Sequence, residues 1–204
     1  MTDEIAKRYK HVSKFEANVA KFCNSPYAVA VDCCTNALFL SLVYVGETTI
    51  ILPRRTYIGV YFAAKHAKCE VALSHVPWAG CYNLKPTNIF DCACMFERDM
   101  YKPNTVMCIS LSYKKRLKVG RGGIILTDNK AFRDWCILAR NLNKDVAKDL
   151  FDQQYSEPGW NMLLHPDLAE KGNRLLKSLP KSSTTTYLNY PDISTQITST
   201  LVAR

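Results

Sequence analysis

The sequence lacks any apolar run close to the roughly 18 to 20 residues that a membrane-spanning helix requires. Its first residues, Met1 to Lys7, also lack the positive charge followed by an apolar stretch that marks a secretory signal. No internal repeat is present, so repeat architectures are not indicated. These absences predict a cytoplasmic protein with no membrane partner.

Zinc-type cysteine spacing is also missing. Nine cysteines are present, but no two of them form the C-x-x-C pair that is typical of zinc sites. Only Cys92 and Cys94 come close to a ligand spacing. Several cysteines fall inside apolar stretches, which indicates buried, reduced thiols and predicts no metal site.

The composition is that of an ordinary globular protein, with 204 residues, of which 48% are hydrophobic and 22% charged. The formal net charge is +9. This excess of positive charge favours an anionic partner, which is a nucleic acid, a membrane surface or a phosphorylated small molecule. The charge alone does not distinguish among these partners.

The pattern of apolar residues predicts an α/β protein in which helices and strands follow one another. Helices are expected over residues 3–22, 36–44, 56–67, 131–141, 143–154 and 166–179. Strands are expected over residues 27–31, 48–53, 69–74, 87–94, 105–110 and 123–126. In the helix over 131–141, Phe132, Trp135 and Leu138 should face inward. Residues 1–180 are the expected domain, and residues 181–204 a peripheral or flexible tail.

A basic stretch follows the strand expected over 105–110 and precedes the strand expected over 123–126. It contains three lysines and two arginines between residues 114 and 121. One interpretation is a solvated surface hairpin that contacts the phosphates of a nucleic acid. The other is a ligand site, because ligands of open α/β sheets bind at strand ends.

The order of residues in this stretch, Ser110-x4-Lys115-x4-Gly120-x-Gly122-Gly123, resembles the lysine motif of the DegT/DnrJ-type sugar aminotransferases. These are fold type I enzymes, similar to aspartate aminotransferase, that use pyridoxal 5'-phosphate (PLP). The resemblance implies that Lys115 is the Schiff-base lysine and that Ser110 binds the cofactor phosphate. Lys114 is the adjacent rival, and the spacing favours Lys115.

A second motif is the turn between the strand over 27–31 and the helix that follows it. The start of a helix is an anion site, because its first amides lack partners and its dipole is positive there. Taken alone, Thr35 is most simply a helix cap. The turn nevertheless resembles the family's phosphate-binding turn, which implies that Thr35 and the neighbouring amide of Cys34 bind the cofactor phosphate. The family usually has glycine at the position of Cys34.

Two further residues take roles from the resemblance. Thr56-Tyr57 matches a Thr-aromatic pair of the family, which implies that Tyr57 stacks on the pyridine ring; a lone tyrosine is otherwise a core or rim residue. Asp91 ends a short apolar strand, where a carboxylate needs a partner unless it caps a helix. The resemblance implies that Asp91 pairs with the pyridine nitrogen. Cys94 stands where the family often has Gln, His or Glu.

The segment Gly159-Trp160-Asn161 resembles a Gly-aromatic-Asn segment of the family. In the family this asparagine reaches the cofactor of the neighbouring subunit, which implies a homodimer with a shared active site. Without the resemblance, Asn161 would be an ordinary turn residue.

Taken together, the resemblance implies a three-layer α/β/α large domain with a mostly parallel sheet. That domain is reduced in size and lacks the usual small C-terminal domain. The implied activity is transfer of an amino group, from glutamate, to a nucleotide-linked keto sugar. A first alternative is a PLP-binding or partner-binding subunit without transaminase activity. A second is a nucleic-acid-binding module that uses the basic stretch.

Overall fold

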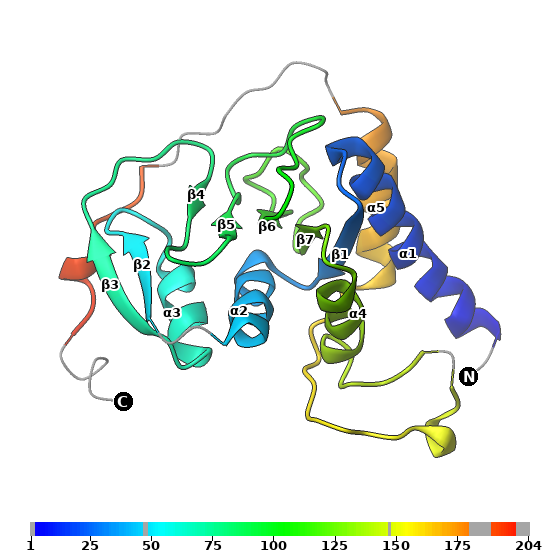
Figure 1. Ribbon diagram of the computed structural model, residues 1–204. Helices are drawn as coiled ribbons and strands as arrows, with labels where there is room; N and C mark the ends of the chain where they lie inside the picture. The colour runs from blue at the N-terminus through cyan, green and yellow to red at the C-terminus, as the bar shows by residue number, and fades with distance from the viewer. Residues whose placement is uncertain (1–2, 47–48, 147, 180–188, 199–204) are drawn as a thin grey trace.

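The structure is a computed structural model that describes residues 3–46, 49–146, 148–179 and 189–198 (Figure 1). Its described helices are α1 (Asp3–Cys23), α2 (Cys34–Val45), α3 (Ile58–His66), α4 (Lys130–Ala139), α5 (Pro166–Lys177) and the 3-10 helices η1 (Leu150–Asp152) and η2 (Ile193–Thr195). Its described strands are β1 (Tyr27–Val31), β2 (Thr49–Pro53), β3 (Glu70–Ser74), β4 (Tyr82–Asn83), β5 (Ile89–Asp91), β6 (Val106–Ser110) and β7 (Gly123–Thr127). The predicted α/β class is confirmed.

The central sheet has the strand order β1-β7-β6-β5-β4. Only β5 and β6 pair in parallel within it, and the other three pairs are antiparallel. β2 and β3 form a separate parallel pair. This pair is joined to the chain after β4 by a bond from the amide of Ile51 to the carbonyl of Lys85 at 2.7 Å. The sheet is therefore mixed, not mostly parallel, because β7 returns beside β6 and β4 returns beside β5.

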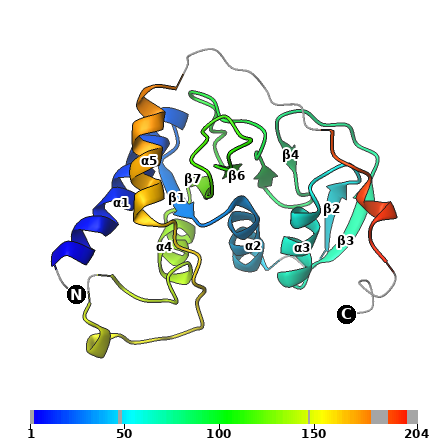
Figure 2. The same cartoon turned by 180° about the vertical axis from the view of Figure 1, so that it is seen from behind.

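Helices cover both faces of the sheet, as the alternation of side chains along β1 requires. Val29 and Val31 belong to a core with residues of α2, α3 and α4, whereas Ala28 and Ala30 belong to a core with residues of α1 and α5. Figures 1 and 2, which view the molecule from opposite sides, show the same arrangement. The three-layer architecture is thus observed.

The helix ends follow from local chemistry. α2 begins two residues earlier than predicted, since the Cys33 sulfur caps it by accepting a hydrogen bond from the amide of Asn36 at 3.4 Å. The helix ends at Gly46, whose φ of 67° is the left-handed conformation that glycine adopts without strain. α5 begins with Pro166, at a position where the missing amide proton is not needed.

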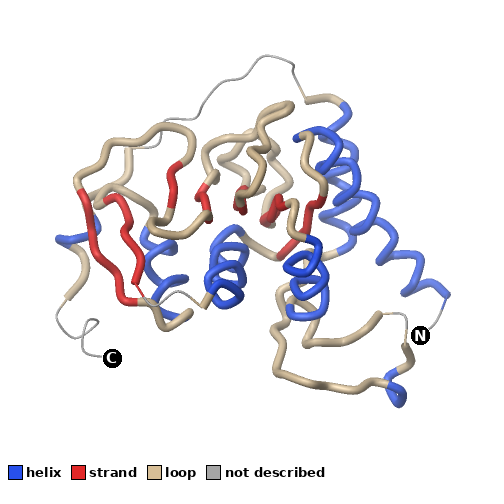
Figure 3. Tube along the Cα trace, in the orientation of Figure 1, coloured by secondary structure: helices blue, strands red, loops and turns tan. Residues whose placement is uncertain are grey.

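The helix predicted over residues 143–154 is wrong. The described part of this segment forms turns and the short η1, drawn mostly as loop in Figure 3. The Gln153 side chain accepts from the backbone amide of Asp145 at 2.9 Å and donates to its carbonyl at 2.8 Å. Such side-chain bonds compete with helical ones. In α4, Leu138 is 37% exposed rather than inward, while Cys136 is buried.

Part of the predicted C-terminal tail packs against the domain. Residues 180–188 and 199–204 lie outside the described residues, and the division at residue 180 stays a prediction. Within residues 189–198, Ile193 is fully buried. Its amide donates to the carbonyl of Arg54 at 2.9 Å. Residues 189–198 are therefore held next to the end of β2 (Figure 1).

None of the nine cysteines, all of which lie in the described ranges, forms a disulfide, and seven of them are buried. In the described ranges, no three side chains of His, Cys, Asp or Glu gather as a metal site would need. The described helices also include none whose length and apolar character would let it cross a bilayer.

Candidate active site

A cavity of about 470 Å³ opens where three strands end. β1, β5 and β6 run in the same direction, since β1 and β6 are both antiparallel to β7 and β5 is parallel to β6. Their carboxyl ends therefore meet at one edge of the sheet, where ligands of α/β proteins bind. The cavity lining includes six predicted site residues, namely Cys34, Thr35, Tyr57, Asp91, Ser110 and Lys115.

The two rival lysines differ in burial. Lys115 is only 8% exposed and lines the cavity, whereas the side chain of Lys114 is exposed. The difference arises because apolar residues anchor the loop on either side, with Leu111 and Val119 fully buried and Leu117 1% exposed. The basic residues of the loop are therefore solvated only in part, since Lys114, Lys118 and Arg121 are exposed whereas Lys115 is buried.

The amine of Lys115 has two defined neighbours. Its Nζ donates to the sulfur of Cys94 at 3.4 Å and to the hydroxyl of Tyr190 at 3.2 Å. The ring of Tyr190 stacks on Trp78 with centroids 5.9 Å apart. Sequence reasoning missed Tyr190, since the Ser/Thr-rich stretch before it carries no periodicity that would mark a site residue.

The carboxylate of Asp91 is 4% exposed at the end of β5. Burial raises its pKa, while the Ala93 amide, the Tyr82 hydroxyl and the charge of Lys115 lower it in part. The Ala93 amide donates to Oδ1 at 2.9 Å. In the described chain no helix begins between Asp91 and α4, so the helix-capping alternative does not apply. Asp91 is a buried acid that faces the cavity.

The start of α2 forms another wall of the cavity. Cys33 is the helix cap, so Thr35 is not, and its side chain lines the cavity instead. Gly123 allows β7 to approach this turn, because a Cβ there would lie 2.5 Å from the carbonyl carbon of Cys33 and 2.7 Å from the nitrogen of Cys34. Ser110, at the end of β6, completes this wall with its hydroxyl.

Tyr57 lies at the rim and precedes the first residue of α3. Its side chain is 56% exposed, so it is not a core residue. Gly59 makes room for it, because a Cβ at Gly59 would lie 2.5 Å from the Tyr57 ring and 3.0 Å from the Thr35 hydroxyl. The ring centroid is 6.5 Å from that of Tyr190.

Asn161 is not part of this cavity. It is exposed and forms an antiparallel bridge with Asn141. The neighbouring Trp160 donates its amide to the carbonyl of Ala139 at 2.6 Å, which places the segment along the end of α4. The structure therefore brings together every predicted site residue except Asn161.

Comparisons with known proteins confirm the resemblance and the fold. The sequence model of the DegT/DnrJ/EryC1/StrS aminotransferase family matches residues 1–89, a range that includes Cys34, Thr35 and Tyr57. None of the curated protein sequences matches the chain. The sequence motifs therefore predicted the family that this segment matches.

Three similar solved structures show the same fold at low identity. DesV from S. venezuelae, in complex with a ketimine intermediate, has 19% identity and a TM-score of 0.67 over 83% of this chain and 57% of its own. The sugar aminotransferase CalS13 from Micromonospora echinospora has 17% identity and a TM-score of 0.69 over 88% and 66%. A GDP-4-keto-6-deoxymannose-3-dehydratase with a trapped PLP-glutamate geminal diamine has 16% identity and a TM-score of 0.66 over 83% and 61%.

Proposed function

From the aminotransferase-family sequence over residues 1–89 and the fold of sugar aminotransferases, we propose that this chain is a cytoplasmic, PLP-dependent aminotransferase. It would transfer an amino group from glutamate to a nucleotide-linked keto sugar. The observation that carries this proposal is a buried lysine amine and a buried carboxylate, Lys115 and Asp91, lining the same cavity as a helix start.

The residues present suit the parts of the cofactor. PLP has an aldehyde, a phosphate and a pyridine nitrogen that is protonated during catalysis. The cavity offers an amine in Lys115, a carboxylate in Asp91 and the amide end of α2 with the hydroxyl of Thr35. Gly59 lets the Tyr57 ring and the Thr35 hydroxyl lie close to the backbone of α3, where a Cβ would clash with both. When bound, PLP supplies an electron sink for bonds at the amino-bearing carbon.

Asp91 would hold the proton on the ring nitrogen. A buried carboxylate is costly without a positive partner, and its raised pKa expresses that cost. A protonated ring nitrogen would remove the cost. The Ala93 amide donates a hydrogen bond to Oδ1 of Asp91 and thereby fixes the orientation of the carboxylate.

Lys115 would hold the cofactor covalently and, once released, move the proton during amino transfer. Each of these steps begins with the free amine, which attacks the aldehyde in the first and accepts a proton that it later returns in the second. Ser110, Thr35 and the amide of Cys34 would bind the phosphate, and Tyr57 would cover the ring. These roles follow the family's motif, residue by residue.

A homodimer is part of the proposal. Asn161 is exposed, and the same excursion of the chain displays Leu150 and Phe151, which are 66% and 97% exposed. We propose that a second copy covers these apolar side chains. The role of Asn161 at the partner's cofactor follows the family's Gly-aromatic-Asn segment.

The most specific part of the proposal is the substrate, a nucleotide-linked keto sugar. Among the similar structures, the dehydratase is named for a GDP-linked keto sugar and holds a PLP-glutamate species, and CalS13 is described as a sugar aminotransferase. The cavity lining also includes the basic residues Lys114 and Arg121, which suit a diphosphate. The formal net charge of +9 agrees with an anionic substrate.

One observation favours a second candidate, a PLP-binding subunit without transaminase activity. The chain spans 57% of the DesV structure that it matches. If this second candidate is correct, Lys115 still binds the cofactor, but no amino donor transfers its amino group to the bound PLP.

An absorption titration with PLP tests the proposal. We expect a band near about 420 nm in the wild type and in Lys114→Ala, but not in Lys115→Ala, because only a lysine bonded to the cofactor produces it. Added glutamate should bleach the band. A band that glutamate leaves unchanged would support the binding subunit, and a wild type without the band would refute both candidates.

A further inference from the structure

We propose that the Tyr190 hydroxyl positions the amine of Lys115 for bonding to the cofactor, and that an ion pair between Arg54 and Asp192 holds Tyr190 in place. This inference rests on the proposed function, because it takes Lys115 as the reacting amine. It assigns a role to residues 189–198, a part of the chain that no family motif predicted.

The contacts of the amine carry the first step. Nζ of Lys115 has the Tyr190 hydroxyl at 3.2 Å and the Cys94 sulfur at 3.4 Å. Sulfur is a weak hydrogen-bond acceptor, so the hydroxyl is the stronger of the two. A four-carbon side chain with free rotation would otherwise spread its amine over many positions. The hydroxyl therefore decides where in the cavity the amine points.

The ring of Tyr190 is held independently of its hydroxyl. It stacks on Trp78 at 5.9 Å and lies 6.5 Å from Tyr57. The indole nitrogen of Trp78 is itself fixed by donating to the carbonyl of Arg55 at 2.8 Å. A phenylalanine at position 190 would keep these ring contacts and lose the hydroxyl, with its bond to Lys115 and its longer contact of 3.7 Å with the Cys94 sulfur.

The hydroxyl is suited to this role in its neutral form. Burial, followed by the neighbouring Cys94 and the charge of Asp91, raises the pKa of Tyr190 above its ordinary value. The hydroxyl of Tyr190 thus stays protonated and uncharged. It offers the amine both a donor and an acceptor.

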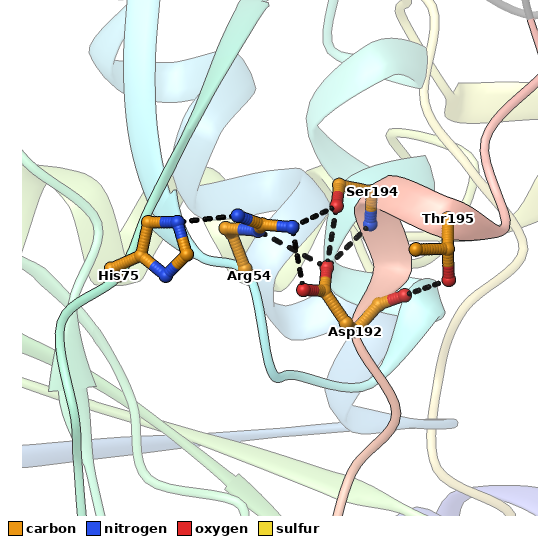
Figure 4. A network of polar contacts seen from close by, with 5 residues as sticks. All are labelled: Arg54, His75, Asp192, Ser194 and Thr195. Atoms are coloured by element: carbon orange, nitrogen blue, oxygen red, sulfur yellow. Dashed lines mark hydrogen bonds and ion pairs between the residues drawn. The ribbon is translucent and has the colours of Figure 1, made fainter.

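Asp192, two residues after Tyr190 in the sequence, forms an ion pair with Arg54 (Figure 4). Arg54 places its guanidinium on Asp192, with NH2 2.7 Å from Oδ2 and Nε 3.2 Å from Oδ1. Arg54 also donates to the hydroxyl of Ser194 at 2.7 Å and contacts His75. Because β2 ends beside Arg54, this guanidinium ties the segment that carries Tyr190 to the body of the domain.

Asp192 is held from its own segment as well. Its Oδ1 accepts from the amide of Ser194 at 3.0 Å and from the Ser194 hydroxyl at 2.6 Å, and its carbonyl accepts from Thr195 at 2.8 Å. The bonds from Ser194 and the charge of Arg54 lower its pKa. The carboxylate therefore stays ionised, and the ion pair persists at neutral pH.

The test is a comparison of Tyr190→Phe with Tyr155→Phe, the same chemical change at an exposed tyrosine outside the cavity. The first measurement is the rate at which the Lys115-dependent PLP band grows. We expect about three- to tenfold slower growth in Tyr190→Phe, the effect of one lost hydrogen bond, and no change in Tyr155→Phe. The second measurement is the affinity for pyridoxine 5'-phosphate, which has no aldehyde and cannot bond to lysine. It should be unchanged in both variants.

Arg54→Met extends the test to the ion pair. It should slow the band as Tyr190→Phe does, and the double variant should be no slower than either single variant, since both act through one contact. Asp192→Asn provides the same test from the other side of the pair. Circular dichroism confirms that each variant is folded.

The results separate the two hypotheses. A wild type with the band and a Tyr190→Phe variant that forms it at the wild-type rate would overturn the positioning role alone. Weaker binding of pyridoxine 5'-phosphate in Tyr190→Phe would overturn it too. The hydroxyl would then contribute to non-covalent binding of the cofactor and not only to the position of the Lys115 amine. A wild type with no band would overturn the proposed function, and with it the reaction that Tyr190 is inferred to assist.

Discussion

The lining of the cavity has two parts that are built in different ways. One part, formed by Cys34 and Thr35, is the start of a helix and offers backbone amides and a hydroxyl. The other part consists of the buried ionisable side chains of Asp91 and Lys115. Backbone amides at a helix start bind anions whatever side chains they carry, whereas a buried acid and amine depend on each atom around them. Cofactor affinity and chemistry should therefore respond separately to substitution.

The largest effect is expected at the buried ionisable side chains. Asp91→Asn should lower the rate of the glutamate reaction by about 100- to 1000-fold, the usual loss when a charge that stabilises a transition state is removed. Binding of pyridoxine 5'-phosphate should fall much less. Stopped-flow absorption measures the rate, and Asp134→Asn, at a carboxylate in an exposed ion pair, is the control. Equal losses of rate and affinity would contradict the claim that the two parts of the lining control affinity and chemistry separately.

A smaller effect is expected at the helix start. Thr35→Val keeps the shape of the side chain but removes the hydroxyl that is proposed to bind the cofactor phosphate. Because hydrogen bonds to charged groups contribute roughly 1.5–3 kcal/mol, PLP should bind about 10- to 100-fold more weakly. The rate at saturating PLP should stay near that of the wild type. Thr49→Val, at an exposed position of β2, should change neither quantity.

Gly123→Ala tests the contact that supports this helix start. The added Cβ would lie 2.5 Å from the carbonyl carbon of Cys33, so the turn must shift. Overpacking of this kind costs about 1–3 kcal/mol. We expect a lower free energy of unfolding in urea together with weaker binding of pyridoxine 5'-phosphate. Unchanged stability would show that β7 does not press on the turn.

The smallest effect is a pH dependence of stability. The pKa of Asp91 is raised in the folded, cofactor-free protein, so between its ordinary pKa and the raised one the folded state binds more protons than the unfolded state. Stability should thus fall as the pH rises through that interval. Urea unfolding at several pH values should show this slope in the wild type and a shallower one in Asp91→Asn. Identical slopes would contradict a raised pKa of the buried Asp91.

Several site residues were predictable because of their positions at strand ends. Asp91 and Ser110 each end an apolar run, and strands that point the same way bring their ends to one edge. The turn of Cys34 and Thr35 was predictable in the same way. The choice between Lys114 and Lys115 came from motif spacing alone, and burial now agrees with it.

Other features depend on contacts that a local pattern does not encode. Tyr190 is 75 residues from Lys115 in the sequence and is placed by the pairing of Arg54 with Asp192. The antiparallel return of β7 was not predicted, because apolar strands look alike in either direction. The prediction of a helix over 143–154 was wrong because the Gln153 side chain forms hydrogen bonds with the backbone amide and carbonyl of Asp145.

The most direct measurement of the central claim is to locate the bonded cofactor. The wild type is incubated with PLP, reduced with borohydride and digested, and the modified lysine is identified by mass spectrometry. We predict modification at Lys115, with Lys114 unmodified, because only Lys115 is buried in the cavity beside Asp91. Modification at Lys114, or spread over surface lysines, would contradict the account.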